Sequence, residues 1–458
     1  MKILLIDPPA ASRIIRDMAG GLGFTGAGPI LGLPPLELAY MAATLLRQGH
    51  EVRVFDSDVE AASEAEALGA VKAFAPEAVV GAVSLPTLYA DCAFIGKLRP
   101  LCSGKVVVKT GISHGPVLKE ILRRSSAELC IYGECDLNIG GILSGSDRRG
   151  AAWLEGEELK TGGDCVVEDL DSLPVPAREL LRNERYGYGL LGNPAATMQT
   201  SRGCPYPCAY YCAYPLVQGK KWRRRSPGNV VDEMEMIVRK LCISKILFRD
   251  ATFTQDRERI MAICAQLKAR GIKADWWCET RVDRLDGELL RSMREAGCRG
   301  INIGVESGDA EVMETQAKVG LTREKLRRVR DDARAAGLKL HFLLMVGLPK
   351  ETRAAIYNTY RLVADLEPES IGVTILTPYP GTPFYQEAKS RGWLETEDWS
   401  RFGGHRPVIH TDNLSADDLD YAQRTLTGLF AGRRRKSLLG RMKTALLELR
   451  FRAWAARR

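Results

Sequence analysis

The chain contains 458 residues, with 65 Lys and Arg against 57 Asp and Glu, so its formal net charge at pH 7 is +8. Hydrophobic residues make up 45% and charged residues 27% of the sequence, which excludes a disordered chain, a collagen-like fibre and a long coiled coil. The length predicts roughly two to four domains, each able to bury a core without disulfide bonds. The 12 cysteines are therefore available for chemistry.

The expected location follows from the absence of targeting patterns. No segment approaches the ~18 consecutive apolar residues of a membrane-spanning helix. The first segment, Met1 to Asp7, reaches an acidic residue too soon for a secretory signal. We expect a cytoplasmic protein whose thiols are reduced.

Residues 1–145 alternate short apolar runs with helical patterns, which predicts an α/β domain with a doubly wound parallel sheet, flavodoxin-like or Rossmann-like. One helix should begin at Pro35, a favoured first helical position, and end before Gly49. Ligands of such sheets bind beyond the C-terminal ends of the strands. The expected strands are Lys2 to Ile6, Glu51 to Phe55, Ala78 to Ser84, Lys105 to Lys109 and Glu128 to Tyr132.

Residues 146–193 lose this alternation and accumulate Gly and Asp, so we expect a linker between two domains. Residues 194–395 repeat a strand–helix unit, which predicts a partial (β/α)6 barrel of the TIM type with its active site at the C-terminal mouth. Residues 396–458 should form a small helical region. The expected barrel strands lie near Ala196 to Thr200, Lys245 to Phe248, Ala274 to Cys278, Gly300 to Val305, Lys339 to Met345 and Ser370 to Leu376.

Three cysteines, Cys204, Cys208 and Cys212, follow the first strand of the predicted barrel within nine residues. Their loop is rich in Gly, Pro and Tyr, and Pro205 and Pro207 stiffen it. A structural zinc ion needs four Cys or His ligands, usually as two pairs, and no second pair follows. Three thiolates instead suit a cubane iron–sulfur cluster with one open iron. Structural zinc and unreactive thiols are the alternatives.

With this loop and five further motifs, residues 1–395 resemble the radical S-adenosylmethionine (SAM) superfamily, specifically its cobalamin-binding branch. The family pattern is usually Cys-x3-Cys-x2-Cys, whereas three residues here separate Cys208 from Cys212. The extra residue displaces Cys212 by up to ~3.5 Å along an extended chain, which a tighter turn can absorb. We therefore expect Cys204, Cys208 and Cys212 to bind a [4Fe–4S] cluster. The other motifs are Phe248 to Thr254, Cys278 to Asp283, Gly304 to Gly308, Val346 to Thr352 and Pro378 to Pro383.

The resemblance implies that the open iron binds SAM and that reductive cleavage of SAM gives a 5′-deoxyadenosyl radical. We expect this radical to activate a carbon of a small or hydrophobic, lipid-like metabolite, which then receives a methyl group through methylcobalamin. A radical oxidoreductase or cyclase is one alternative, and a non-catalytic metal-binding protein that docks on a membrane or nucleic acid is another. The expected protein partner is an electron donor such as flavodoxin or ferredoxin. The resemblance identifies no catalytic side chain.

The resemblance also places cobalamin at the strand ends of the N-terminal sheet. A flavodoxin-like domain with a nucleotide or no ligand is the alternative, although no Gly-x-Gly-x-x-Gly turn follows a strand. The Asp-x-His-x-x-Gly motif is absent, so we expect that no histidine binds cobalt. The alternative is that His114, which follows a strand end, is an unusual cobalt ligand. The expected cobalamin contacts are Pro34, Pro35, Ser84, Leu85, Thr87, Gly111, Gly133 and Glu134.

The expected SAM contacts lie at the ends of the barrel strands. The planar guanidinium of Arg281 matches a carboxylate, and Gly347 permits close approach of the backbone to adenine. An ordinary salt bridge at the rim is the alternative role for Arg281 and Glu306. The full set of expected contacts is Asp250, Arg281, Glu306, Gly347 and Leu348.

The C-terminal segment 433–458 contains ten basic residues and one acidic residue, a net charge of +9 that leaves −1 for the rest of the chain. Its apolar residues recur at near-helical spacing, which predicts a basic amphipathic helix. Such a helix can lie on the anionic inner face of a membrane, or it can pack on the protein and leave its charges in water. Nucleic acid is not favoured, because these basic residues offer only phosphate contacts.

Overall fold

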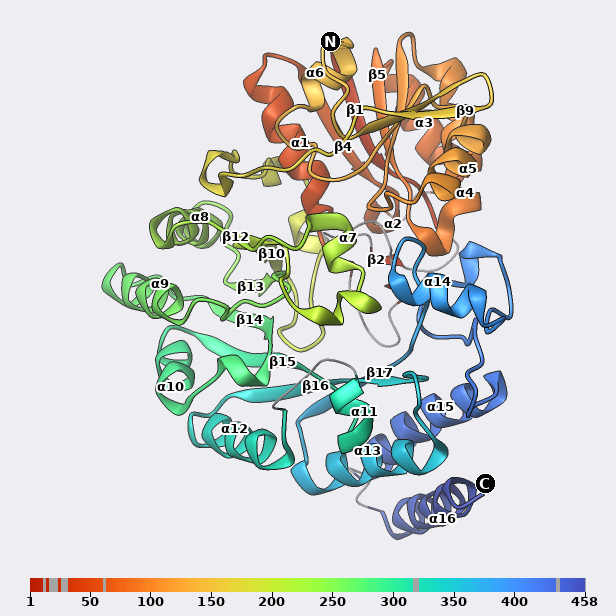
Figure 1. Cartoon of the computed structure of the whole chain (residues 1–458). Helices are drawn as coiled ribbons and strands as arrows, with labels where there is room; N and C mark the ends of the chain where they lie inside the picture. Colours follow the sequence, from red (N-terminus) through yellow and green to blue (C-terminus); the bar gives the residue numbers. More distant parts are fainter. Residues whose placement is uncertain are drawn as a thin grey trace.

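The chain forms two α/β domains followed by C-terminal helices, as seen in a computed structural model that describes residues 1–10, 14–15, 24–25, 32–60, 63–315, 321–433 and 437–457. Figure 1 shows the N-terminal domain at one end of the molecule, the second domain in the middle and the last helix at the other end. Within these described residues, no helix has both the length and the apolar composition needed to cross a membrane.

The N-terminal domain is built on a seven-stranded sheet. In spatial order its strands are β4 (Glu51–Asp56), β1 (Lys2–Asp7), β5 (Ala78–Ala82), β6 (Lys105–Lys109), β7 (Leu129–Ile131), β8 (Ala151–Glu155) and β9 (Glu158–Thr161). The first five of these pair in parallel, which confirms the predicted strands. A separate short pair joins β2 (Ile14–Ile15) to β3 (Phe24–Thr25).

Helices cover both faces of this sheet. They are α1 (Leu36–Arg47), α2 (Ser57–Glu60), α3 (Glu64–Phe74), α4 (Leu88–Leu98), α5 (Gly115–Ser125) and α6 (Ile139–Ser144). Ile3 and Leu5 of β1 pack in one apolar cluster with α1 and α6, whereas Leu4 and Ile6 pack in another with α3, α4 and α5. This alternation is the pleat of a strand that is buried on both sides, and it confirms the doubly wound architecture.

The predicted end of this domain at residue 145 is too early. β8 pairs antiparallel with β7 and then with β9, so the sheet continues to Thr161. Residues of this hairpin are largely half-exposed or exposed. They therefore lack the continuous apolar run by which a buried parallel strand is recognised in a sequence.

The connector between the domains is anchored on the second domain. It contains the short 3-10 turns η3 (Leu170–Ser172), η4 (Arg178–Leu180) and η5 (Asn183–Arg185). The Arg178 guanidinium lies 2.6 Å from the Glu233 carboxylate, which also binds Arg225 at 2.5 Å, and all three side chains are buried. A buried carboxylate between two guanidiniums fixes this part of the connector in place.

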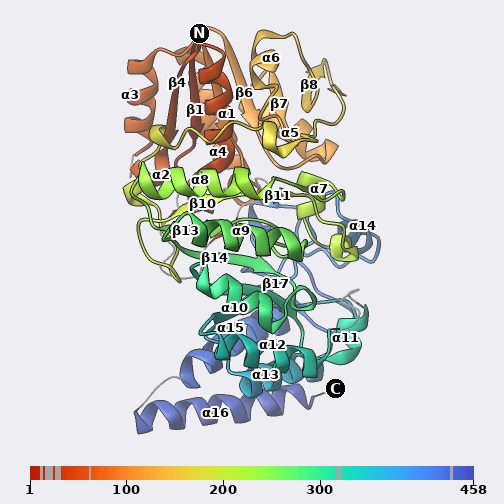
Figure 2. The ribbon, with the colours of Figure 1, turned by 90° about the vertical axis from the view of Figure 1, so that its left-hand side faces the viewer.

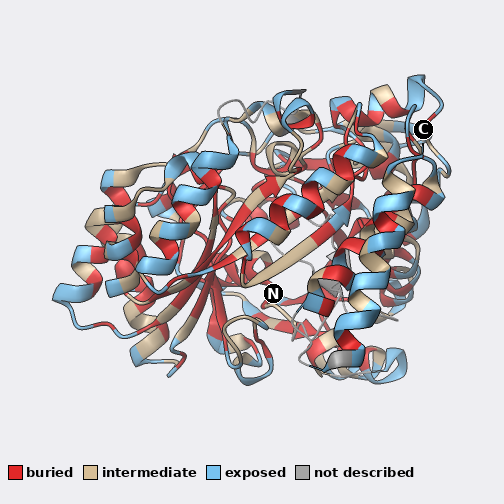
Figure 3. Cartoon of the chain, turned by 90° about the horizontal axis from the view of Figure 1, so that it is seen from below, coloured by how far each residue is buried: buried red, intermediate tan, exposed pale blue. Residues whose placement is uncertain are grey.

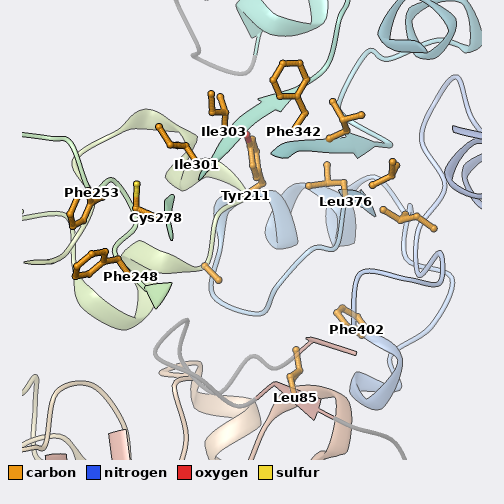
Figure 4. Packing of buried hydrophobic residues seen from close by; sticks show 14 of the residues in the cluster. Leu85, Tyr211, Phe248, Phe253, Cys278, Ile301, Ile303, Phe342, Leu376 and Phe402 are labelled. Atoms are coloured by element: carbon orange, nitrogen blue, oxygen red, sulfur yellow. The ribbon is translucent and has the colours of Figure 1, made fainter. Parts of the chain in front are cut away.

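The second domain contains six parallel strands in chain order, as expected for a partial barrel. They are β10 (Ala196–Met198), β13 (Lys245–Phe248), β14 (Asp275–Thr280), β15 (Cys298–Glu306), β16 (Lys339–Val346) and β17 (Ser370–Ile375). Their outer side packs against helices, where Phe248 stacks on Phe253 at 4.5 Å between ring centroids and Phe342 lies beside the same core (Figure 4).

Capping residues set the start of each outer helix of the barrel. Figure 2 faces several of these helices, stacked one above another in chain order. The side chains of Ser226, Asp256, Asp286, Thr322 and Thr352 each accept a hydrogen bond from a backbone amide in the first turn. The helices are α8 (Pro227–Arg239), α9 (Arg257–Ala269), α10 (Gly287–Glu295), α12 (Arg323–Ala335) and α13 (Arg353–Leu366), with the short α11 (Ala310–Thr315) before α12.

The C-terminal region is helical, as predicted. It contains η8 (Trp399–Arg401), α15 (Ala416–Arg433) and α16 (Leu438–Ala455), and α14 (Pro383–Ser390) precedes it. α15 packs against β17, and α16 packs against α13 and α15 at the far end of the molecule from the N-terminal domain (Figure 1). This region also contacts the N-terminal domain, because η8 packs against the turn η1 (Leu85–Thr87) that follows β5.

Candidate functional site

The three clustered cysteines lie in a lobe at the C-terminal end of β10. The two-residue strands β11 (Ser201–Arg202) and β12 (Arg223–Arg224) pair antiparallel and close this lobe, which contains η6 (Pro207–Tyr210) and α7 (Tyr214–Gln218). Gly203 enters the lobe at φ +85°, and a Cβ atom there would lie 2.1 Å from the Lys221 carbonyl oxygen. Only glycine fits this position, because both the conformation and the space exclude a side chain.

The extra residue between Cys208 and Cys212 is taken up by a tight turn. The Cys208 carbonyl accepts hydrogen bonds from the Tyr211 amide at 3.1 Å and the Cys212 amide at 3.0 Å. Tyr211 is buried in the barrel core near Ile303 (Figure 4), whereas the Tyr210 hydroxyl donates to Glu387 of α14. The two tyrosines thus anchor the turn from opposite sides.

The donor set of the lobe suits an iron–sulfur cluster. Cys204 is buried and the other two thiols are half-buried. Burial raises the pKa of Cys212, and the neighbouring Cys208 and Cys204 raise it further, so the three sulfurs lie within electrostatic reach of one another. Among the described residues, no three His, Cys, Asp or Glu side chains converge on a point that could hold a single metal ion. A cubane cluster does not need such convergence, because each thiolate binds a different iron.

Two of the expected SAM contacts lie beside this lobe. The Arg281 guanidinium sits 3.9 Å above the Tyr206 ring, and its surroundings include the Cys208 thiol. Glu306, at the end of β15, contributes to the electrostatic environment of both Tyr211 and Cys212. Glu306 also has φ +63°, an unfavourable conformation for a residue with a side chain. The ends of β14 and β15 therefore bring a cation and an anion to the cysteine lobe.

Asp250, another expected SAM contact, is fully buried. Its buried carboxylate accepts hydrogen bonds from the Thr200 amide at 3.1 Å, the Thr200 hydroxyl at 2.8 Å and the Ser201 hydroxyl at 2.5 Å. Burial raises the pKa of Asp250, and these hydrogen bonds oppose that rise. Asp250 thus holds the chain that leads from β10 into the cysteine lobe.

The segment after β16 is organised by a residue that the sequence did not single out. Glu351 is fully buried, and its Oε2 accepts hydrogen bonds from the Gly347 amide at 2.7 Å and the Leu348 amide at 3.3 Å. Its Oε1 has no hydrogen-bond partner in the structure. Burial raises the pKa of Glu351 to about 8. The signal in the sequence was that Glu351 is an acidic residue within the motif Val346 to Thr352. A carboxylate that is buried with its motif usually has a structural role.

A side chain from the connector packs against two strands of the barrel, β14 and β15. Tyr188 lies edge-on to Trp277, with ring centroids 6.1 Å apart, and its hydroxyl is 3.3 Å from Asn302 Oδ1. The Trp277 indole donates to the same oxygen at 2.7 Å. The candidate SAM contacts lie elsewhere, at the C-terminal ends of β13 to β16.

The expected cobalamin contacts lie at the C-terminal edge of the N-terminal sheet. The Ser84 and Thr87 hydroxyls are 2.6 Å apart, and Thr87 donates to Asp91 at 2.5 Å. Leu85 is buried close to Phe402 of the C-terminal region (Figure 4). Pro34 and Pro35 precede α1, Gly111 follows β6 and Gly133 follows β7. His114 packs edge-on against Tyr385 of α14, with ring centroids 5.7 Å apart.

Buried ion pairs join this edge to the cysteine lobe. Arg223 of β12 binds Glu134 with both guanidinium nitrogens, at 2.7 and 2.6 Å. Arg202, its partner across the β11–β12 pair, binds Asp136 at 2.6 Å and lies 3.3 Å from Glu134. Both carboxylate oxygens of Glu134, an expected cobalamin contact, thus bind Arg223, and this ion pair joins the two domains. The sequence did not indicate this role for Asp136, Arg202 and Arg223, because the two residues of each ion pair are more than 60 positions apart.

A small cavity lies beside these ion pairs, between the two domains. Charged groups from both sides line it, including a buried ion pair between Lys109 and Glu37 at 3.1 Å. The cavity marks where the C-terminal edge of the N-terminal sheet faces the cysteine lobe. It is lined by Glu37, Met41, Lys109, Gly133, Glu134, Cys135, Asp136, Arg202, Val217 and Gln218.

Comparisons with known proteins agree with this architecture. Residues 198–363 match the family model of the radical SAM superfamily. An uncharacterised methyltransferase of Pyrococcus horikoshii is 28% identical over 92% of this chain and 90% of its own length. A hopanoid C-3 methylase of Methylococcus capsulatus is 27% identical over 83% of this chain and 73% of its own length.

Two solved structures share the fold across both domains. The radical SAM methyltransferase TsrM from Kitasatospora setae, with cobalamin and a [4Fe–4S] cluster bound, has a TM-score of 0.67 at 17% identity and covers 85% of this chain and 75% of its own. The cobalamin-dependent radical SAM enzyme OxsB has a TM-score of 0.73 at 14% identity and covers 99% of this chain and 71% of its own.

Residues 198–363 therefore form a radical SAM domain, and the two solved structures that share the fold contain cobalamin with a [4Fe–4S] cluster or with SAM. The doubly wound domain followed by a partial barrel is the fold that this chain shares with TsrM and OxsB.

Proposed function

We propose that this protein is a cobalamin-dependent radical SAM methyltransferase that acts on a carbon of a small or hydrophobic metabolite. The observation that carries the proposal is the buried joint between Glu134 and Arg223, because it fixes the cysteine lobe against the strand ends where a cobalamin would lie. Several relatives bear methyltransferase names, among them the hopanoid methylase and a cytidylyl-2-hydroxyethylphosphonate methyltransferase.

In this proposal Cys204, Cys208 and Cys212 hold the cluster, and the contacts to SAM come from the rim of the barrel. Arg281 and Glu306 hold its carboxylate and ribose, and the backbone at Gly347 and Leu348 approaches its adenine. Asp250 is a positioning residue for the cysteine lobe, because its oxygens already accept hydrogen bonds from Thr200 and Ser201.

We propose that the cobalamin contacts lie in the N-terminal domain, across the Glu134–Arg223 ion pair from the cysteine lobe. They are Pro34, Pro35, Ser84, Leu85, Thr87, Gly111 and Gly133, with Glu134 positioning the domain rather than contacting the corrin. His114 is not proposed as a cobalt ligand, because its ring packs on Tyr385 and its pKa is lowered chiefly by burial.

When bound, the cluster would supply the electron for cleavage of SAM, and cobalamin would supply the methyl group that is transferred. The residues of this chain bind and orient these groups and exclude water from the space between the domains. Reduction requires an electron donor, for which we propose a flavodoxin or a ferredoxin.

A radical cyclase is the second candidate. An anaerobic magnesium-protoporphyrin IX monomethyl ester cyclase of Cereibacter sphaeroides is 25% identical over 86% of this chain, although this chain covers only 66% of that relative. The two candidates differ in products: both form 5′-deoxyadenosine, but only the methyltransferase forms S-adenosylhomocysteine in a cobalamin-dependent manner. Anaerobic incubation with SAM and a strong reductant, followed by mass spectrometry, separates them.

A further inference from the structure

The last helix, α16, is fixed on the protein by an aromatic cluster on its inner face. Phe451 is fully buried and stacks on Trp454 at 5.3 Å between ring centroids. It also packs edge-on against Tyr357 and Tyr360 of α13, at 5.9 and 6.0 Å. These contacts determine which side of α16 faces outward.

The outward side of α16 is an exposed apolar stripe. Leu439, Met442, Leu446 and Leu449 are exposed by 64%, 62%, 51% and 63%, respectively. Their spacing of three, four and three residues places them on one side of a helix, and helical periodicity places that side opposite Phe451. The other large apolar side chains that are exposed among the described residues lie before residue 180, so this stripe is a concentrated patch.

Basic residues border the stripe on both sides. By helical periodicity, Lys443 and Arg450 lie along one edge and Arg441 and Arg452 along the other, and all four are exposed. The acidic residue of the helix, Glu448, interacts instead with the Tyr360 hydroxyl on the inner face. Figure 3 looks at the molecule from below, the end where α16 lies, and pale blue residues run along the helix that leads to the C-terminus.

We propose that the outer face of α16, defined as Leu439, Met442, Leu446 and Leu449 with their four basic neighbours, docks on an anionic lipid bilayer. A helix with an apolar stripe between two basic rows lies in the plane of the interface, with the stripe at the acyl boundary and the cations at the phosphates. A second copy of the chain fits less well, because helix-to-helix packing would bring basic rows together. This inference does not depend on the proposed catalytic function.

The test is co-sedimentation of the full-length protein with phosphatidylcholine vesicles that contain or lack phosphatidylglycerol. We expect binding only to the anionic vesicles, and weaker binding at high salt. The double variant Leu446→Gln/Leu449→Gln should lower the vesicle partition at least about tenfold, because two leucines no longer transfer to an apolar environment. Lys443→Gln/Arg450→Gln should lower it by about fivefold for each charge removed.

The matched control is Leu46→Gln/Leu137→Gln, which changes two exposed leucines of the N-terminal domain and should leave vesicle binding unchanged. All substituted side chains are exposed, and thermal unfolding followed by circular dichroism checks that each variant is folded. The proposal is overturned if the unaltered protein does not bind anionic vesicles, or if both α16 variants bind as it does. If the unaltered protein instead formed a concentration-dependent dimer, did not bind vesicles, and lost the dimer on the same leucine substitutions, the outer face of α16 would bind a second copy of the chain.

Discussion

Glu134 and Arg223 form a bidentate ion pair, at 2.6 and 2.7 Å, in which both side chains are buried and the two residues belong to different domains. Arg223 also donates to the carbonyls of Val167 and Gln218, so its guanidinium links the N-terminal sheet, the connector and the cysteine lobe. Together with Arg202, this side chain holds the two cofactor regions proposed above in a fixed arrangement.

Removing one member of this ion pair should be strongly destabilising. Glu134→Gln leaves the Arg223 guanidinium buried without a counter-charge, and we expect the free energy of unfolding to fall by about 3–5 kcal/mol. Glu168→Gln is the matched control, because Glu168 of the connector pairs with Lys221 of the lobe at 2.7 Å on the exposed surface, so its loss should leave the free energy of unfolding nearly unchanged. Denaturant unfolding measures both, and equal effects would contradict the structural role of Glu134.

Gly203 should be irreplaceable for the shape of the cysteine lobe. Gly203→Ala places a Cβ atom 2.1 Å from the Lys221 carbonyl oxygen in a residue with φ +85°. We expect this variant to lose most of its bound iron after anaerobic reconstitution. Gly219→Ala, in the same lobe, has φ +74° and ψ 175° but nothing within 4 Å, so it should keep its iron and lose only the stability that this backbone conformation costs, about 1–3 kcal/mol. Iron retention by the Gly203 variant would show that the lobe adapts.

The iron content of cysteine variants should distinguish the three cysteines of the lobe from the other cysteines. Cys204→Ala, Cys208→Ala and Cys212→Ala should each abolish the charge-transfer absorbance of the cluster, because each removes one of three protein ligands. Cys242→Ala changes an exposed cysteine outside the lobe and is the control. If Cys212→Ala alone retained a full cluster, the tight turn at Cys208 would not serve to place a third ligand.

Glu351 should make the protein less stable as the pH rises. The pKa of its carboxyl is raised from 4.5 to about 8 by burial, so the folded state keeps a proton that the unfolded state loses above about pH 4.5. The free energy of unfolding should therefore fall between about pH 4.5 and pH 8, by at most about 1.4 kcal/mol per pH unit.

Glu351→Gln should flatten this dependence and be more stable than the unaltered protein at pH 7, by about 1–3 kcal/mol. The amide oxygen still accepts hydrogen bonds from Gly347 and Leu348, and the amide does not ionise. Denaturant titrations of the two proteins at several pH values give the difference directly. Parallel curves would show that the carboxyl does not hold a proton in the folded state.

Much of the fold could be predicted from the sequence, since buried parallel strands leave continuous apolar runs such as Val106 to Val108. The capping serine at Ser226 likewise marked the start of α8. The β8–β9 hairpin was missed, because its side chains are partly exposed and carry no such run.

The site was predictable only where the chemistry lies in a local motif. Cys204, Cys208 and Cys212 are close in sequence, so their spacing alone indicated a cluster. Glu134 and Arg223 are 89 residues apart, and no pattern in one sequence joins them. Asp250 was expected to contact SAM because it lies in a family motif, and the sequence did not indicate the hydrogen bonds that its oxygens accept from Thr200 and Ser201, about 50 residues away.

The central claim, methyl transfer with SAM and cobalamin, is tested most directly by mass spectrometry of products. Anaerobically reconstituted protein would be incubated with SAM and a strong reductant, with and without cobalamin, and 5′-deoxyadenosine and S-adenosylhomocysteine would be measured. We predict both products, with S-adenosylhomocysteine formed only when cobalamin is present. Formation of 5′-deoxyadenosine alone, with cobalamin bound, would contradict methyl transfer and favour the cyclase.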